Sequence, residues 1–307
     1  MADLSVHDSR NAPTHPVWDD DADARYAPFG HYTLSPWREA CRSLGPRLYP
    51  RRYPRLGSII TWPIWRLSLL GRPGAVDLEP FPGFRLRLYP LENHADTKCF
   101  SRAALCDLPE ERAIARCAVS SPDHQFIVVD VGANTGTYSV LAANLARRIG
   151  KSTNLVCIEA NPKTQARLAE NLHFSGLEHC SHLVACAVSN APGSVMLDTS
   201  QWNLGSVKVT DARVGQMQKT VVSVPARPLS SIVNEVGLNR IDLLKIDIEG
   251  HEIPALAPFL REAPAHLLPR MILAETKHDT NAKLAALIIA AGYHVTHHGR
   301  SDTVFER

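Results

Sequence analysis

The stretch FIVVDVGANTG at residues 126–136 constrains the fold of this chain more than any other part of the sequence. Four apolar residues lead into Asp130, Gly132 and Gly136 follow, and residues 137–145 then carry apolar side chains at helical spacing. This order predicts a buried strand, a tight loop and a helix. Glycines let a ligand approach the loop backbone, and the helix points free N–H groups at it, so we expect a ligand site here. The alternative is a glycine turn that only packs the strand on the helix.

The residues between the two glycines indicate what kind of ligand the loop accepts. Loops that bind dinucleotides usually read GxGxxG, whereas Ala133 and Asn134 stand here where a pyrophosphate favours glycine. The loop therefore favours a ligand without phosphates, such as S-adenosylmethionine, over NAD.

Downstream of the loop, strand and helix patterns alternate as a doubly wound α/β fold requires. We expect strands at residues 155–159, 182–188, 241–247 and 270–275. We expect helices at residues 163–172, 229–236 and 281–291. Two further strands, at residues 194–198 and 220–225, flank a polar segment and predict an inserted hairpin.

The chain ends in two short strand patterns, at residues 293–297 and 303–306, joined by a few turn residues. Such a short connection only allows antiparallel pairing, because a parallel return needs a crossover of about a dozen residues or more. We therefore predict a mostly parallel sheet with an antiparallel C-terminal hairpin.

Glu159 ends the second predicted strand of this sheet. An acid at this position can accept hydrogen bonds from both hydroxyls of a ribose, so we expect Glu159 to anchor an adenosine. The alternative is a strand-end carboxylate that caps the next helix, for which Asn161 is a natural N-cap and Pro162 a natural first residue.

The strand at residues 241–247 runs into the acidic sequence DIEGHE. Asp247 and Glu249 are two residues apart, so they share one face with Lys245 if the strand persists. An alcohol is a poor nucleophile until its proton leaves, and a base beside it would remove that proton. One carboxylate can position the donor while the other, or His251, accepts the proton. The alternative is a charged strand end followed by a glycine turn.

Metal binding is the less favoured interpretation of the same acids and histidine. Ala255 occupies the place of the second histidine of HExxH, which argues against zinc hydrolysis. The acids, with His251 and His278, can still bind a divalent metal that acidifies a hydroxyl. We rank this below simple base catalysis and predict no metal.

Composition limits the partners and the location. A chain of 307 residues with 45% hydrophobic and 21% charged residues is ordinary globular protein. Its formal charge of +2 is too small to predict nucleic-acid binding. Seven cysteines without a CxxC pair indicate free thiols, and the N-terminus lacks an apolar signal core, so we expect a cytoplasmic protein.

The N-terminal part carries no readable chemistry. Residues 1–30 are polar and predicted to be disordered, residues 31–80 form an irregular or helical extension, and residues 81–307 form the main domain. The apolar residues 59–70 (Ile59 at the start, Leu70 at the end) are too short to span a membrane. They predict either weak contact with a membrane surface or a helix packed on the domain or a partner. The oligomeric state stays open.

Taken together, the motifs resemble the FkbM family of S-adenosylmethionine-dependent methyltransferases. The resemblance covers residues 84–307 and is carried by VVDVGANTGTYS, IEANP, AVSN with Gly193, and LLKIDIEGHE. His251 departs from the apolar or small residue often found there in the family. The resemblance implies a class I methyltransferase domain, with a Rossmann-like doubly wound sheet, that methylates a hydroxyl of a sugar, glycoconjugate or small natural product.

The candidate site residues follow from these motifs. The candidate catalytic residues are Asp247, Glu249 and His251. The residues expected to bind S-adenosylmethionine are Asp130, Gly132, Ala133, Asn134, Gly136, Thr137, Glu159, Ala160, Asn161, Ala187 and Val188. Two other classes of function stay open, an NAD(P)-dependent Rossmann oxidoreductase or epimerase, and a cofactor-binding protein without turnover.

Overall fold

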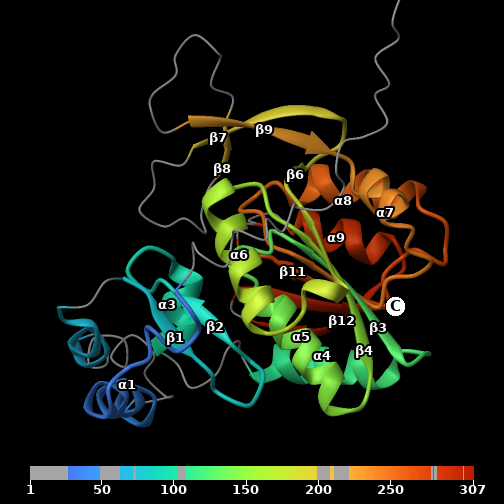
Figure 1. Cartoon of the computed structure of the whole chain (residues 1–307). Helices are drawn as coiled ribbons and strands as arrows, with labels where there is room; N and C mark the ends of the chain where they lie inside the picture. Colours follow the sequence, from blue (N-terminus) through green and yellow to red (C-terminus); the bar gives the residue numbers. More distant parts are fainter. Residues whose placement is uncertain are drawn as a thin grey trace, which may run out of the picture.

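A seven-stranded sheet forms the centre of the computed structural model (Figure 1). The structure describes residues 27–48, 63–71, 74–101, 108–198, 208–210, 221–277, 279, 282–299 and 301–307. The strand order is β12-β13-β11-β10-β3-β4-β5. The strands are β3 (Gln125–Val131), β4 (Ser152–Ile158), β5 (Ser181–Val184), β10 (Leu243–Ile246), β11 (Met271–Glu275), β12 (His294–His298) and β13 (Asp302–Glu306).

The directions of these strands confirm the predicted sheet. β10 pairs in parallel with β3 and β11, and β4 pairs in parallel with β3 and β5. β13 runs antiparallel to both β11 and β12. The predicted antiparallel C-terminal hairpin is therefore present.

Helices cover both faces of the sheet because its central strands are apolar on both faces. One core joins Val128 and Leu243 to helices α4 (Leu108–Ser120), α5 (Thr137–Arg148) and α6 (Pro162–Phe174). The other core joins Val129 and Leu244 to α7 (Leu229–Val236), α8 (Glu252–Glu262) and α9 (Lys283–Ala290). Successive residues of a strand thus alternate between the two cores.

The sequence prediction of one strand over residues 182–188 is wrong. β5 ends at Val184, and the Cys186 N–H donates to the Val184 carbonyl at 3.2 Å, which closes a tight turn. The chain then enters a separate four-stranded sheet, in the order β6-β9-β7-β8, above the main sheet in Figure 1. Its strands are β6 (Ala187–Val188), β7 (Gly193–Asp198), β8 (Lys208–Thr210) and β9 (Val221–Arg227). β7 pairs antiparallel with β9, so the predicted inserted hairpin is confirmed.

The N-terminal elements lie beside α6, at the lower left of Figure 1. They comprise α1 (Pro36–Leu48), a helix at residues 63–69, the antiparallel pair β1 (Val76–Leu78) and β2 (Leu86–Leu88), and α3 (His94–Ser101). Residues 1–26 lie outside the described residues, so the disorder predicted there stays a prediction, as does the division into domains.

The described part of the apolar segment 59–70 packs on the protein. Trp65 is buried and its ring centroid lies 6.1 Å from that of Phe100, whereas Leu67 and Leu70 are exposed. Residues 59–62 lie outside the described part, and contact with a membrane surface stays a prediction. Among the described helices, none has both the length and the hydrophobicity that a bilayer crossing needs.

A buried ion-pair network fastens the N-terminal hairpin to α6. The Arg87 guanidinium contacts Asp77 at 2.7 Å and Glu170 at 2.6 Å. The same group lies over the rings of Tyr32 and Phe174, 4.7 and 4.6 Å from their centroids. β1, β2 and α6 therefore share one charged cluster that water does not reach.

Candidate functional site

Four acids lie where parallel strands of the main sheet end, which we call the carboxyl edge. Asp130 is near the end of β3, Glu159 follows β4, Asp247 follows β10 and Glu275 ends β11. These strands are neighbours in the order β11-β10-β3-β4. Open α/β sheets bind ligands at this edge, so the acids define the candidate site.

The glycines of the GANTG loop are required by packing. Gly132 has a φ of 76°, and a Cβ there would lie 2.0 Å from the backbone oxygen of Asp247. Gly136 has a φ of 85°, and a Cβ there would lie 2.6 Å from Cδ1 of Leu168. The loop therefore fits closely against the turn after β10 and against α6, which is the packing alternative left open by the sequence.

Asp130 is buried beneath this loop, with one oxygen bound and one orphaned. Its Oδ2 accepts a hydrogen bond from the Ser139 hydroxyl at 2.6 Å, whereas its Oδ1 has no partner among the described residues. Burial raises the pKa of Asp130, which the nearby Lys245 ammonium and Ser139 partly oppose. A buried carboxylate oxygen without a partner is unusual in proteins and marks a place for a ligand donor.

Glu159 joins the two loops that follow β3 and β4. Its Oε2 accepts the Asn134 N–H and its Oε1 accepts the Asn161 N–H, both at 2.8 Å. Asn161 caps α6, because its side chain accepts the Lys163 N–H at 3.1 Å. Each carboxylate oxygen of Glu159 has a second lone pair, so the structural contacts leave acceptors for ribose hydroxyls.

The remaining predicted cofactor residues line the same region. Ala133 and Thr137 are buried in the loop and in the first turn of α5, and the Thr137 hydroxyl has no partner among the described residues. Ala187 and Val188 are buried in β6, and Ala160 packs against the small apolar cluster that contains Ala187. The turn that ends β5 thus brings β6 towards the end of β4.

The GANTG loop is also held by residues that the sequence analysis missed. Asn93 donates to the Asn134 side chain at 2.6 Å, and Asp96 accepts the Thr135 hydroxyl at 2.7 Å. Asn171 of α6 donates to the Thr135 carbonyl at 2.7 Å. The sequence signal was weak, since residues 91–96 look like an ordinary turn that follows a strand.

The carboxylates of Asp247, Glu249 and Glu275 meet beyond β10 and β11. One oxygen from each lies within 4.8 Å of the others. The strand does not persist to Glu249, so strand alternation does not put Asp247 and Glu249 on one face: β10 ends at Ile246 and Glu249 has a φ of 53°. A turn brings them together instead.

The turn itself is held by Glu252. Its Oε1 accepts the N–H groups of Ile248 and Gly250, at 3.0 and 3.1 Å. Glu252 is buried, so these bonds are shielded from water and fix the position of Glu249 between them.

The Lys245 ammonium lies among these acids. The Lys245 Nζ is 3.5 Å from Oδ2 of Asp247 and 4.7 Å from the centroid of the Tyr138 ring. Burial disfavours the charge of Lys245, but Asp247 and Asp130 outweigh it, so its pKa is raised. Burial, then Asp247 and Glu249, raise the pKa of Glu275 to about 8, so Glu275 carries a proton at neutral pH.

The same three carboxylates form an oxygen-rich group that could hold a divalent cation. A proton shared with Glu275 satisfies the same geometry without a metal, because two neighbouring carboxylates resist ionising together. His278, which the sequence placed near this group, lies outside the described residues.

His251 occupies a separate position at the start of α8. Its Nε2 lies 3.2 Å from the Ser189 hydroxyl, and it does not join the three-carboxylate group among the described residues. Burial lowers the pKa of His251, so the neutral ring is favoured at neutral pH and can accept a proton. The structure thus brings Asp247 and Glu249 together with Glu275 and leaves His251 beside Ser189.

The order and direction of the strands define a class I methyltransferase fold, in which the last strand, β13, lies antiparallel between β11 and β12. The family described as the methyltransferase FkbM domain matches residues 130–295. The chain therefore belongs to the FkbM methyltransferase family.

Known proteins resemble the chain over part of their length. The 2-O-methyltransferase NoeI of Sinorhizobium fredii is 27% identical over 143 residues, which cover 43% of this chain and 56% of NoeI. The crystal structure of methyltransferase FkbM from Methylobacillus flagellatus is 13% identical, with a TM-score of 0.42, over 88% of this chain and 59% of that one. An O-methyltransferase from Bacillus cereus in complex with SAH is 10% identical, with a TM-score of 0.38, over 66% of this chain and 82% of that one. The chain thus spans little more than half the length of NoeI and of the Methylobacillus protein.

Proposed function

We propose that this protein transfers a methyl group from S-adenosylmethionine to a hydroxyl of a small, sugar-containing acceptor. The observation that carries the proposal is the group formed by Asp247, Glu249 and Glu275, whose oxygens lie within 4.8 Å of one another beside the GANTG loop. A base and a cofactor loop at one edge of the sheet are what methyl transfer to an alcohol requires.

The residues present fit S-adenosylmethionine. The orphaned Oδ1 of Asp130 offers an acceptor to its ammonium or to a water beside it, and Glu159 keeps lone pairs for the ribose hydroxyls. Ala160 and Ala187 offer a small apolar surface for the adenine. When bound, the cofactor supplies an electrophilic methyl group on a positively charged sulfur.

The chain's own residues then orient the acceptor and take its proton. Lys245 holds Asp247, and the Glu252 carboxylate holds the turn that carries Glu249, so the two carboxylates are fixed before an acceptor arrives. We assign the proton-accepting role to this pair. His251, neutral and bonded to Ser189, is the second candidate for the same role.

Acceptor and location follow from weaker observations. The relative NoeI is a 2-O-methyltransferase, which supports a hydroxyl acceptor, and the FkbM resemblance supports a sugar or a glycosylated small molecule. We also propose a cytoplasmic location, which the free cysteines of the described part support.

Calorimetry tests the cofactor directly. We expect S-adenosylmethionine and its demethylated product to bind, and NAD(P) to bind far more weakly or not at all. Tight binding of NAD(P) alone would instead favour the oxidoreductase or epimerase reading. Binding of S-adenosylmethionine without methyl transfer to any of a panel of glycosides would favour a binding protein without turnover.

A further inference from the structure

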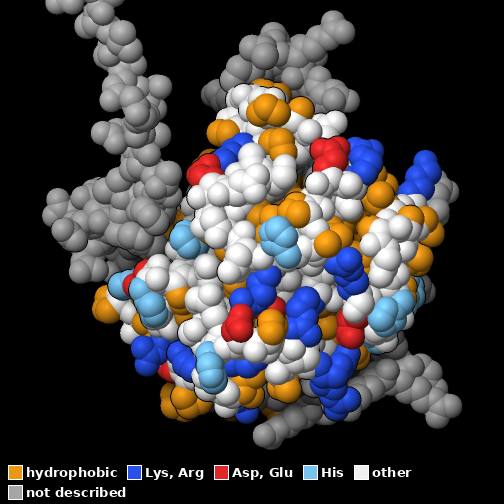
Figure 2. Space-filling model, turned by 90° about the vertical axis from the view of Figure 1, so that its right-hand side faces the viewer, with side chains coloured by type: hydrophobic (Ala, Val, Ile, Leu, Met, Phe, Trp, Pro, Cys, Tyr) orange, Lys and Arg blue, Asp and Glu red, His pale blue; other side chains and the backbone are white. Residues whose placement is uncertain are grey.

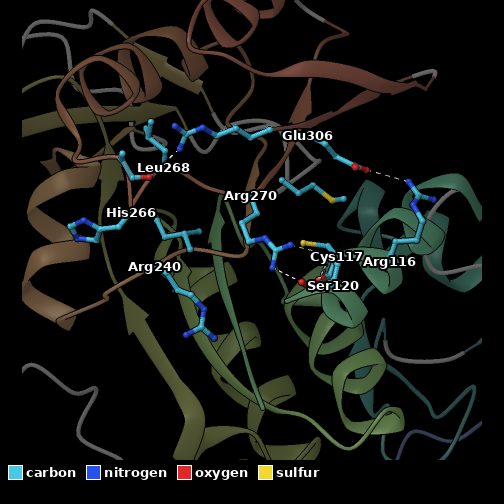
Figure 3. A pocket seen from close by; sticks show the side chains of 12 residues that line it. Arg116, Cys117, Ser120, Arg240, His266, Leu268, Arg270 and Glu306 are labelled. Atoms are coloured by element: carbon cyan, nitrogen blue, oxygen red, sulfur yellow. Dashed lines mark hydrogen bonds and ion pairs between the residues drawn. The ribbon is translucent and has the colours of Figure 1, made fainter. Parts of the chain in front are cut away.

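A cavity of about 380 Å³ opens at the opposite edge of the sheet, which we call the amino edge (Figure 3). Its lining includes Arg240 just before β10, Arg270 just before β11 and Arg307 just after β13. The C-terminus lies on the right of Figure 1, and Figure 2 shows Lys and Arg side chains in the middle of that side of the molecule.

The charged side chains that line the cavity are four arginines and one acid, Glu306. Two of the arginines are compensated by carboxylates. Arg116 pairs with Glu306 at 3.3 Å, and Arg240 pairs with Asp123 at 2.6 Å and with Asp242 at 3.3 Å.

The other two arginines are compensated less closely. Arg270 donates to the Ser120 carbonyl at 2.5 Å, as Figure 3 shows, and reaches Asp242, which already pairs with Arg240, only at 4.0 Å. Arg307 donates to the Ala265 carbonyl at 3.0 Å and has no carboxylate partner among the described residues. Their guanidinium groups keep further N–H donors for a ligand.

Arg270 and Arg307 are neighbours across the sheet. The Arg307 N–H donates to the Arg270 carbonyl at 3.1 Å, which continues the pairing of Met271 with Glu306. Their side chains reach different elements, because Arg270 donates to Ser120 at the end of α4 and Arg307 donates to Ala265 just beyond α8. Both side chains line the cavity, so an anion bound in it would accept their remaining N–H groups.

The floor of the cavity is apolar. Ile241 and Met271 are buried, and Leu268 lines the cavity beside them. A volume of this size, with an apolar floor and a few convergent polar groups, is typical of a small-molecule site.

We propose that this cavity binds an organic phosphate. The phosphate dianion is held by Arg270 and Arg307, because guanidinium forks match phosphate oxygens and two cations match its two charges. The carbon body of the ligand rests on Ile241, Leu268 and Met271. The site lies across the sheet from the acids of the carboxyl edge, and its existence does not depend on the proposed methyl transfer.

Calorimetry on the full chain with phenyl phosphate, inorganic phosphate and benzoate tests the proposal. We expect phenyl phosphate to bind tightest. Inorganic phosphate should bind about 10-fold or more weakly, because it has no apolar group to contact the floor of the cavity. Benzoate should bind weakest. Equal binding of benzoate and phenyl phosphate would overturn the phosphate assignment, and the absence of binding by all three would overturn the site.

Two variants assign the binding to the named arginines. Arg307→Gln and Arg270→Gln should each weaken phenyl phosphate about 10-fold or more, because each removes charge-assisted hydrogen bonds. Arg261→Gln, on an exposed arginine that pairs with Glu262 at the end of α8, is the matched control and should bind as the parent does. If Arg270→Gln unfolds, Arg307→Gln decides alone, and unchanged affinity in Arg307→Gln contradicts the proposal.

Discussion

The two edges of the main sheet gather different charged side chains, mostly acids at the carboxyl edge and arginines with their paired acids at the amino edge. β10 begins after Arg240 and ends before Asp247, and β11 begins after Arg270 and ends at Glu275. β13 runs the other way, from Asp302 to the residue before Arg307, so its acid and its arginine fall at the same edges.

The two edges of the sheet therefore suit ligands of different charge. The carboxyl edge gathers acids around the Lys245 ammonium and favours bound protons and cationic groups, whereas the amino edge gathers guanidinium groups and favours anions. Burial strengthens the tendency of the carboxyl edge, because charges in a low dielectric interact more strongly than in water, whereas at the amino edge Arg270 is partly exposed and Arg307 is exposed.

The variant Asp247→Asn is expected to have the largest effect at the carboxyl edge. If Asp247 and Glu249 take the proton, the rate of methyl transfer should fall about 100-fold or more, with S-adenosylmethionine affinity retained. A radiolabelled methyl-transfer assay measures the rate. Glu262→Gln, on an exposed carboxylate of α8, is the control. An unchanged rate in Asp247→Asn and Glu249→Gln, with a large loss in His251→Ala, would move the role to His251.

Gly132→Ala tests how closely the carboxyl edge is packed. The new Cβ would lie 2.0 Å from the Asp247 carbonyl oxygen, on a backbone with a φ of 76°. We expect a loss of about 3 kcal/mol or more in the free energy of unfolding. Gly237→Ala has a similar φ of 72° but meets no atom within 4 Å, and should cost about 1 kcal/mol. Urea unfolding compares the two, and equal losses would show that strain in φ outweighs the clash.

Glu275 makes stability depend on pH. Its pKa is raised from 4.5 to about 8, so the stability it contributes is fully present below its unfolded pKa and is lost as pH rises through the folded one. Between about pH 5 and about pH 9, the free energy of unfolding should fall further for the parent than for Glu275→Gln, by on the order of 2 kcal/mol. Asp302, whose pKa burial raises to about 7, adds a fall in the same direction to both proteins. Identical pH profiles would remove Glu275 as a proton carrier.

Metal removal is expected to have the smallest effect. If the three carboxylates act with a proton and no metal, EDTA should leave the methyl-transfer rate unchanged. Loss of activity with EDTA, restored by Mg²⁺ or Mn²⁺, would assign Asp247, Glu249 and Glu275 as metal ligands instead.

The sequence predicted the sheet well because apolar strand runs and short turns are local signals. The antiparallel hairpin follows from the few residues between β12 and β13. The split between β5 and β6 was missed because the apolar run continues through the turn at Cys186, so hydrophobicity alone does not reveal it.

The geometry around the candidate site residues differs in part from what the sequence predicts. Asp247 and Glu249 do meet, but through a turn with a positive φ that strand alternation does not anticipate. The hold of Asn93 and Asp96 on the GANTG loop joins residues far apart in the chain, and no local pattern reports such a contact. The glycines were read chiefly as an opening for a ligand, whereas Gly132 and Gly136 have packing reasons of their own.

The buried cluster around Arg87 bears on where this protein can be shortened. A truncated protein that starts at residue 81 would lack Asp77 and keep Arg87 with Glu170 as its one remaining carboxylate. Stripping one partner from a buried ion pair costs about 3–5 kcal/mol, a large fraction of the stability of a typical domain. A shortened protein that keeps this cluster intact therefore has to begin upstream of β1.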